Sequence, residues 1–138
     1  MEITTTLALR SMTVTAHEIA NALALSPDSV RVRGARVRAT SGRRNRFHAW
    51  EIQDVRVGDG DDVAASVRSL FERLRGQRPS LEKIREAGVE VAVSVCVDDF
   101  SDNISFVLPE LLIREASELG ASVFLDVYLA EGEASDDG

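Results

Sequence analysis

The stretch Val89-Glu90-Val91-Ala92-Val93-Ser94-Val95-Cys96-Val97 decides the fold. Valine occupies every second position, and mostly small side chains occupy the positions between. Because successive side chains of a β-strand point to opposite faces, this pattern predicts a strand with one fully apolar face. The small, weakly polar second face indicates a strand in the middle of a sheet, with another part of the protein close behind it.

Similar alternation before and after this stretch predicts four more strands, over residues 3–9, 30–37, 47–52 and 123–129. Between them, apolar residues recur with the period of a helix. The clearest set lies on one helix face and consists of Val63, Val67, Leu70, Phe71 and Leu74. Shorter helices are predicted over residues 16–26, 81–87 and 109–119, and Asp61 or Asp62 is expected to cap the longest helix.

The predicted order is strand, helix, strand, strand, two helices, strand, helix, strand. This order is typical of an α+β domain with a mixed β-sheet and helices packed mainly on one face, similar to a ferredoxin-like sandwich with an additional helix and strand. We expect residues 1–130 to form a single domain in which 89–97 and 121–129 are neighbouring strands. The two outer strand-helix-strand units are expected to be right-handed crossovers wherever their strands are parallel neighbours. Residues 131–138 are predicted to be an acidic, disordered tail.

The composition is that of one globular domain, with 138 residues of which 44% are hydrophobic and 28% charged. The single cysteine, Cys96, cannot form an internal disulfide, and its apolar neighbourhood predicts a small buried side chain in a reducing compartment. The N-terminus lacks the basic and apolar regions of a signal peptide, and no stretch has the length of a membrane span. We therefore expect a cytoplasmic protein that does not bind membranes.

Charge is distributed unevenly along the chain. Residues 1–50 carry eight arginines and three acids, a net of +5, whereas residues 51–138 carry eight basic and twenty acidic residues, a net of −12. Residues 29–49 hold seven arginines and no acid. Two interpretations stay open: a surface for a partner, or two solvated faces. The asymmetry also predicts that any homodimer is sensitive to salt, because salt screens attraction between opposite charges.

The C-terminal third carries a family resemblance in Phe106-x-Leu108-Pro109-Glu110-Leu111-Leu112, in Leu119-Gly120 and in Leu125-Asp126-Val127-Tyr128. These stretches resemble the ending of a widespread bacterial family, domain of unknown function 4279. The N-terminal half is similar to the same family from His17 to Pro27, and the family's tryptophan-bearing strand falls on Trp50. The resemblance spans residues 3–129 and departs from the family in the arginine-rich region 31–46. It implies a small standalone domain and no established activity.

Asp126 is the first candidate site residue, because an acid within an apolar strand must face solvent or find a hydrogen-bond donor. Alternation places Asp126 on the face opposite Val123, Leu125 and Val127 and beside Phe124 and Tyr128. That face is either open to solvent or the floor of a groove. In the second case Asp126 and Tyr128, with His48 or Trp50, would form a polar and aromatic recognition site.

The arginines form a second candidate site. Strand alternation predicts that Arg31 and Arg33 share a face, and the adjacent loop could add further phosphate contacts. Nucleic acid is nevertheless an unlikely partner, because the net charge of −7 repels a polyanion and few aromatic side chains are available for stacking. The arginines proposed to contact a ligand or partner are Arg31, Arg33, Arg43, Arg44 and Arg46.

The sequence contains no recognisable catalytic, metal or cofactor motif. The two histidines, His17 and His48, and Cys96 lack the spacing of zinc ligands, and the acidic loop from Asp98 to Asn103 lacks the glycine and distal glutamate of a calcium loop. No residue near Cys96 in the sequence would lower its pKa. We therefore expect a non-enzymatic protein without a cofactor or a metal.

The function that we predict is that of a protein-binding module, such as an immunity-type or regulatory protein that masks a basic partner surface. The acidic surface would come from residues 98–102, 110, 115, 118 and the tail. The alternative is a small-ligand or nucleic-acid binder that uses the arginine-rich segment 31–46 or a groove around Asp126.

Overall fold

The computed structural model describes residues 1–37, 42–100 and 105–129, and within them the chain forms five β-strands and four α-helices. The strands are β1 (Glu2–Ser11), β2 (Ser29–Arg31), β3 (His48–Val57), β4 (Glu90–Phe100) and β5 (Ala121–Leu129). The helices are α1 (Ala16–Leu23), α2 (Gly60–Leu74), α3 (Arg78–Glu86) and α4 (Glu110–Glu118), and the 3-10 turn η1 (Arg75–Gln77) joins α2 to α3. The predicted order of elements is confirmed. The tail predicted at 131–138 lies outside the described residues.

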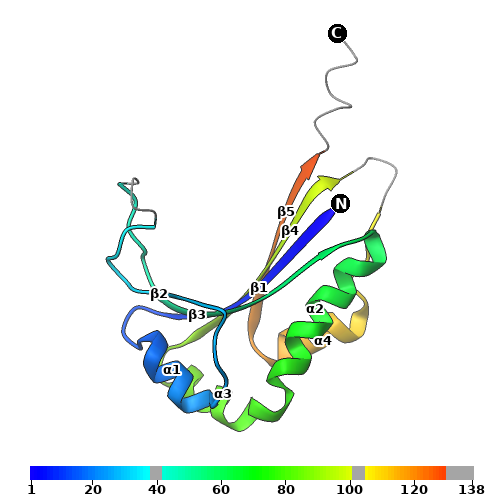
Figure 1. Ribbon diagram of the computed structural model, residues 1–138. Coiled ribbons are helices and arrows are strands. Elements are labelled where there is room, and N and C mark those ends of the chain that lie inside the picture. The colour runs from blue at the N-terminus through cyan, green and yellow to red at the C-terminus, as the bar shows by residue number, and fades with distance from the viewer. Residues whose placement is uncertain (38–41, 101–104, 130–138) are drawn as a thin grey trace.

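The strands form one mixed sheet in the order β2-β3-β1-β4-β5 (Figure 1). β1 is antiparallel to both β3 and β4, and β2 is antiparallel to β3. β5 runs parallel to β4, with Val93 opposite Val123. The valine-rich stretch is therefore an interior strand, and its predicted pairing with 121–129 is confirmed.

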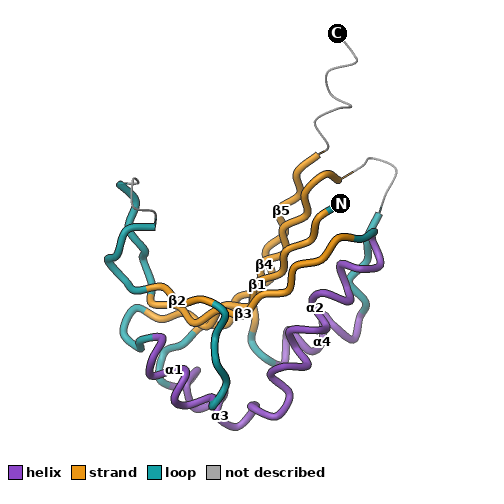
Figure 2. The backbone as a smooth tube through the Cα atoms, in the orientation of Figure 1, coloured by secondary structure: helices purple, strands orange, loops and turns teal. Residues whose placement is uncertain are grey.

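All four helices lie on the same face of the sheet (Figures 1 and 2), which confirms the predicted α+β architecture. The five apolar residues predicted for the longest helix are all buried in α2. The N-cap of α2 is Asp59, and not Asp61 or Asp62. The side chain of Asp59 accepts a hydrogen bond from the Asp61 backbone N–H at 3.0 Å, and the Asp62 carboxylate accepts one from the Asp59 N–H at 2.9 Å. This reciprocal pair satisfies N–H groups that the first turn of a helix leaves unpaired.

The helix-covered face of the sheet forms the core. The odd-numbered valines of β4 are buried there with Leu7 and Leu9 of β1 and with Trp50 and Ile52 of β3. The opposite face, which we call the open face, is covered by no helix of the described residues (Figure 2). Ala92 and Ser94 are small because they line a hollow on the open face. Ala92 on the second face of β4 is nevertheless buried, and the side chains of Arg10, Phe47 and Phe124 line the same hollow.

The first predicted strand-helix-strand unit is paired differently from the second. β1 and β2 are not neighbours, because β3 lies between them, so only β4 and β5 form a parallel crossover pair. β2 is also shorter than the predicted strand 30–37. Gly34 adopts a φ of +84°, in the left-handed region that favours glycine, and the Ala35 N–H closes a turn onto the Val32 carbonyl at 3.1 Å. The turn ends the strand and starts an arm.

A cluster of polar side chains lies between α2 and the helix-covered face of the sheet. Ser66 Oγ of α2 lies 2.7 Å from Thr5 Oγ1 and 2.8 Å from Asp54 Oδ2. Since Ser66 has a single hydroxyl proton, it donates to the carboxylate and accepts from Thr5. Asp54 also receives two hydrogen bonds from Arg56, at 2.7 and 3.0 Å. These bonds, those from Arg56 first, hold the pKa of Asp54 below its usual value despite partial burial.

No helix among the described residues is both long and apolar enough to cross a lipid bilayer.

Candidate functional site

The open face carries a strip of small side chains through the middle of the sheet. Ala8 of β1 stands opposite Ala92 of β4, and Thr6 stands opposite Ser94. The sheet is strongly curved, and a segment rises at its β2 end while β5 stands at the other end (Figure 1). Because the middle of the strip carries no large side chain, the curvature leaves a hollow between the two ends.

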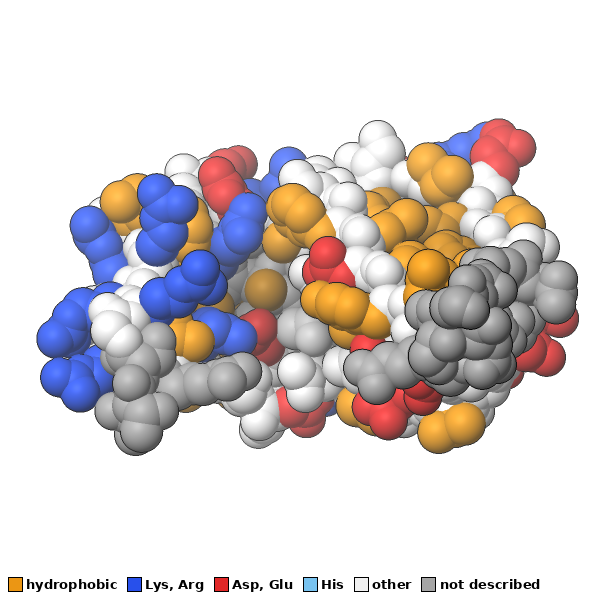
Figure 3. Space-filling model, turned by 90° about the horizontal axis from the view of Figure 1, so that it is seen from above, with side chains coloured by type: hydrophobic (Ala, Val, Ile, Leu, Met, Phe, Trp, Pro, Cys, Tyr) orange, Lys and Arg blue, Asp and Glu red, His pale blue; other side chains and the backbone are white. Residues whose placement is uncertain are grey.

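We call the described parts of the rising segment, residues 32–37 and 42–47, the arginine arm. Its two described halves pair with each other: the Gly34 N–H donates to the Asn45 carbonyl at 2.9 Å, and the Asn45 N–H donates to the Ala35 carbonyl at 2.8 Å. Farther out, the Val37 N–H donates to the Arg43 carbonyl at 2.9 Å. The hydrogen bonds make the arm a hairpin-like projection, and its blue side chains gather at one end of the molecule in Figure 3.

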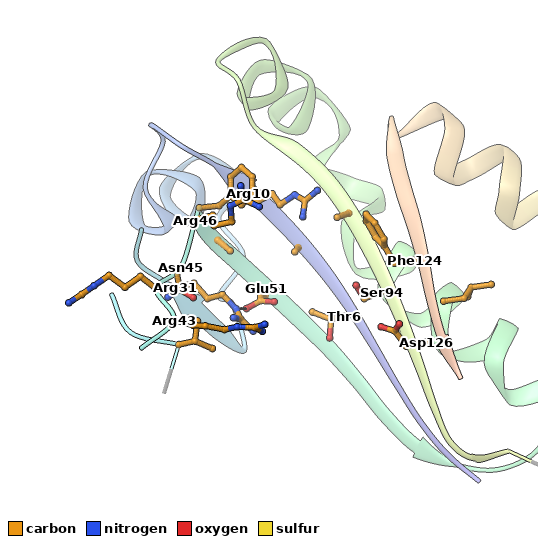
Figure 4. A pocket seen from close by; sticks show the side chains of 17 residues that line it. Thr6, Arg10, Arg31, Arg43, Asn45, Arg46, Glu51, Ser94, Phe124 and Asp126 are labelled. Carbon is orange, nitrogen blue, oxygen red and sulfur yellow. Dashed lines mark hydrogen bonds and ion pairs between the residues drawn. The ribbon is translucent and has the colours of Figure 1, made fainter. Parts of the chain in front are cut away.

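The hollow is a groove of about 790 Å³ between the arm and β5 (Figure 4). The wall on the arm side is formed by Arg31, Val37, Arg43, Arg44, Asn45, Arg46 and Phe47. The floor is formed by Thr6, Ala8, Arg10, Ala49, Glu51, Ala92 and Ser94. The opposite wall is formed by Phe124, Leu125 and Asp126 of β5. The groove therefore combines five arginines with two phenylalanines, two acids and several aliphatic side chains.

Arg10 is the central residue of the floor. Its guanidinium carbon lies 5.1 Å from the ring centre of Phe47 and 5.8 Å from that of Phe124, so the cation contacts aromatic rings from both walls. Arg10 Nε also lies 3.5 Å from Glu90 Oε2, an ion pair without hydrogen-bond geometry. Its Nε is buried and makes no hydrogen bond with a described residue. Arg10 thus links the two walls and keeps donor capacity.

The other arginines differ in how far they are occupied by partners. Arg31 Nε donates to Glu51 at 2.9 Å, and Glu51 is otherwise almost fully buried. Arg44 donates to the Gly34 carbonyl at 2.8 Å and thereby braces the arm. Within the described part of the chain, Arg46 makes no hydrogen bond and no ion pair. Arg31, Arg43, Arg44 and Arg46 are therefore all exposed, and Arg31 and Arg44 are in addition held by contacts within the chain.

Arg33 does not line the groove, and its predicted place beside Arg31 on one face is wrong. The turn after β2 rotates the chain, so the Arg33 backbone N–H donates to His48 Nδ1 at 3.1 Å. Its guanidinium donates to the Met12 carbonyl at 3.1 Å. Arg33 and His48 instead connect the base of the arm to the loop after β1.

The predicted group of Asp126, Tyr128, His48 and Trp50 is not assembled. Trp50 is completely buried on the helix-covered face, where its Nε1–H donates to the Leu25 carbonyl at 3.3 Å. Its alternation with Ile52 places both on the core face. Asp126 lines the groove, and Tyr128 is exposed two residues farther along β5. The groove interpretation of Asp126 is thus supported, with different neighbours from those predicted.

The sequence interpretation missed Arg10, Phe47, Glu51 and Phe124. A signal exists for Arg10 and Glu51, which alternate with buried residues of β1 and β3, and Phe124 alternates with the apolar residues Val123 and Leu125 of β5. Alternation assigns these residues to the second face of their strands. Alternation does not show which strands are neighbours, and the order of the strands in the sheet is what brings Arg10 between Phe47 and Phe124.

Cys96 lies on the open face, opposite Asp126 in the neighbouring strand, and is only partly buried where a small buried side chain was predicted. Burial raises the pKa of its thiol, and the charges of Asp98, Asp126 and Glu2 raise it further. Such a thiol is a poor nucleophile at neutral pH. Within residues 1–37, 42–100 and 105–129, no three His, Cys, Asp or Glu side chains are grouped so that they could hold a metal ion.

Comparison with known proteins identifies a family. The family described as domain of unknown function DUF4279 matches residues 1–130, and the chain belongs to it. No curated protein and no solved structure shows significant similarity to the chain. The family resemblance found in the sequence is therefore confirmed.

Proposed function

We propose that this member of the DUF4279 family is a cytoplasmic, non-enzymatic binding module that holds an acidic segment of a partner protein in its groove. The observation that carries the proposal is the convergence of five arginines and two phenylalanines on one concave face. Arginine is well suited to carboxylates, because its planar guanidinium donates two parallel hydrogen bonds to the two oxygens.

The groove matches a peptide better than it matches a compact anion. Its aliphatic lining, including Val37, Ala8 and Leu125, would cover apolar side chains that alternate with acids along an extended segment. Asp126 on the opposite wall would accept a hydrogen bond from a backbone N–H or a cationic group of the partner. A nucleic-acid backbone has no apolar side chains for this aliphatic lining, and its unbroken row of phosphates would place negative charge against Asp126.

An immunity-type or regulatory protein that masks a basic surface is the competing proposal, and the ion pairs weaken it. Three of the acids expected to form its acidic surface are paired within the chain: Glu110 with Arg114, Glu115 with Arg75 and Glu118 with Arg78. Each pair reduces the charge that a partner would meet. Asp98 and Asp99 remain exposed, and the two other positions in the loop, 101 and 102, lie outside the described residues.

The experiment is fluorescence anisotropy with three probes: a labelled peptide of alternating glutamate and leucine, its lysine-leucine counterpart, and a single-stranded DNA oligonucleotide. We expect the acidic peptide to bind most tightly, with an affinity that falls as salt rises. Arg46→Glu reverses a charge at the rim and should weaken binding about tenfold, equivalent to about 1.4 kcal/mol.

Arg68→Glu is the matched control, because Arg68 is an exposed arginine on α2, on the opposite side of the sheet. It should bind the acidic peptide as the wild type does. Preferential binding of the lysine peptide would favour an acidic mask, and binding of the oligonucleotide alone would favour a nucleic-acid site. Either result, or an Arg46→Glu variant with unchanged affinity, contradicts the groove proposal.

A further inference from the structure

β5 is an edge strand of the sheet. Its nine residues pair with β4 on one side, and no other strand of the described chain pairs with it. Apolar side chains on both faces are more than 40% exposed: Val123, Phe124, Leu125, Val127, Tyr128 and Leu129. β5 contains no proline and no basic residue, and Asp126 is its single charge. Natural proteins protect edges with such features, because a long apolar edge otherwise recruits another strand.

We propose that β5 pairs with β5 of a second copy of this chain, antiparallel and centred on Leu125, so that two five-stranded sheets become one. Leu125 is the middle residue of Ala121–Leu129, so a two-fold axis at this position pairs the strand over its whole length. Every outward backbone group of the two edges would then face a partner. This inference is independent of the peptide proposed to bind in the groove.

Side-chain chemistry favours this register. Opposite residues of an antiparallel pair point to the same face, so Val123 would meet the second copy's Val127, and Phe124 would meet its Asp126. Centring the pair on Asp126 would place two carboxylates opposite each other and shorten the overlap to seven residues. Centring it on Phe124 would also leave seven. The Leu125 register alone combines full overlap with separated acids.

The helix layer is compatible with the same axis. A two-fold axis perpendicular to the sheet keeps the helices of both copies on one face and the grooves on the other. α4 packs beside β5 and exposes two more apolar side chains, Leu111 and Ile113. Because Phe124 and Asp126 form the outer wall of the groove, the second copy's β5 would extend that wall.

Cysteine cross-linking tests the register directly. In a Cys96→Ser background, Leu125→Cys should form a disulfide-linked dimer on oxidation, because opposite Cα atoms lie about 4.5–5.5 Å apart, within disulfide range. Val123→Cys is the matched control. It would lie opposite Val127 and four residues, or roughly 13 Å, from its own counterpart, and should not cross-link. Equal cross-linking of the two variants would overturn the register.

Sedimentation measures the assembly itself. We expect the wild type to be a dimer that persists between roughly 0.1 M and 1 M salt, since backbone hydrogen bonds and apolar contacts are little screened. This outcome differs from the salt-sensitive homodimer that the charge asymmetry of the sequence predicts. Leu125→Asp should be a folded monomer, whereas Val57→Asp, an exposed change on β3, should remain a dimer. Arg46→Glu should also dimerise, which separates this proposal from that of the groove. A monomeric wild type, or a dimer that dissociates in high salt, would overturn it.

Discussion

The two edge strands of the sheet, β2 and β5, differ in how the outer side of each is covered. At the β2 edge, a strand of three residues is followed by a turn, and Asp28 extends the pairing just before β2 begins. The Asp28 backbone N–H donates to the Glu51 carbonyl at 2.8 Å, and its carboxylate accepts from the Gln53 N–H at 2.7 Å. Arg73 of α2 donates to the same carboxylate at 3.2 Å. Polar groups of the chain itself thus close this edge.

At the β5 edge, nine residues present backbone and apolar side chains without any comparable closure among the described residues. An exposed edge is therefore not a general property of this sheet, because polar groups cover the β2 edge and none of the described residues cover the β5 edge. The proposed pairing of β5 with a second copy rests on this difference between a closed edge and an apolar one. Three predictions test how far the two edges differ.

The largest effect is expected from aspartate at two paired positions. Val93→Asp buries a charge in the core and should cost several kcal/mol, enough to unfold the domain. Val123→Asp makes the same change on the neighbouring residue of β5, where the side chain is 43% exposed, and should leave a folded protein. Far-UV circular dichroism with thermal melting compares the two variants. If Val123→Asp unfolded the protein as Val93→Asp does, β5 would be part of the core.

A smaller loss of stability is expected from the polar cluster of Thr5, Asp54 and Ser66. This cluster lies between α2 and the strands β1 and β3, which connect the closed edge to the rest of the sheet. Ser66→Ala removes the hydroxyl between Thr5 and Asp54 and leaves both with a missing partner, at a cost of about 1–3 kcal/mol. Urea denaturation measures the loss. Ser117→Ala, a change of the same size at an exposed position of α4, provides the control and should cost less. Equal losses would show that the buried contact to Thr5 contributes little.

The smallest effect on stability is expected from the Asp28 side chain, whose hydrogen bonds close the β2 edge. Asp28→Ala should cost about 1 kcal/mol at neutral pH, because the carboxylate is partly exposed and its interactions are screened. The hydrogen bond from Gln53, more than that from Arg73, lowers the pKa of Asp28. The stabilisation is therefore complete above the ordinary aspartate pKa and is lost as pH falls through the lower pKa of the folded protein.

The pH dependence of the same variant supplies the test. The difference in the free energy of unfolding between wild type and Asp28→Ala should shrink as pH falls below about 4, the ordinary value for an aspartate. Urea titrations at neutral and acidic pH measure it. A difference that stayed constant with pH would mean that the Asp28 charge does not stabilise the closed edge.

The sequence by itself determined much of the local structure. The valines from 89 to 97 specified a strand and its buried face, and the set from Val63 to Leu74 specified the buried face of α2. The residues from Phe106 to Tyr128 also identified the family. Such features depend on neighbours within a few positions along the chain, and side-chain period alone distinguishes the two faces of an element.

Only the tertiary structure decided what each face meets. Trp50 was correctly placed on a strand, but the helix layer that covers its face could not be read from residues 47–52. The groove depends on Arg10, Phe47 and Phe124, which are up to 114 residues apart in the sequence and meet because β1 pairs with both β3 and β4. β5 is exposed because no strand follows it in the sheet order. Strand order depends on contacts between distant segments, and local periodicity carries no information about which segments become neighbours.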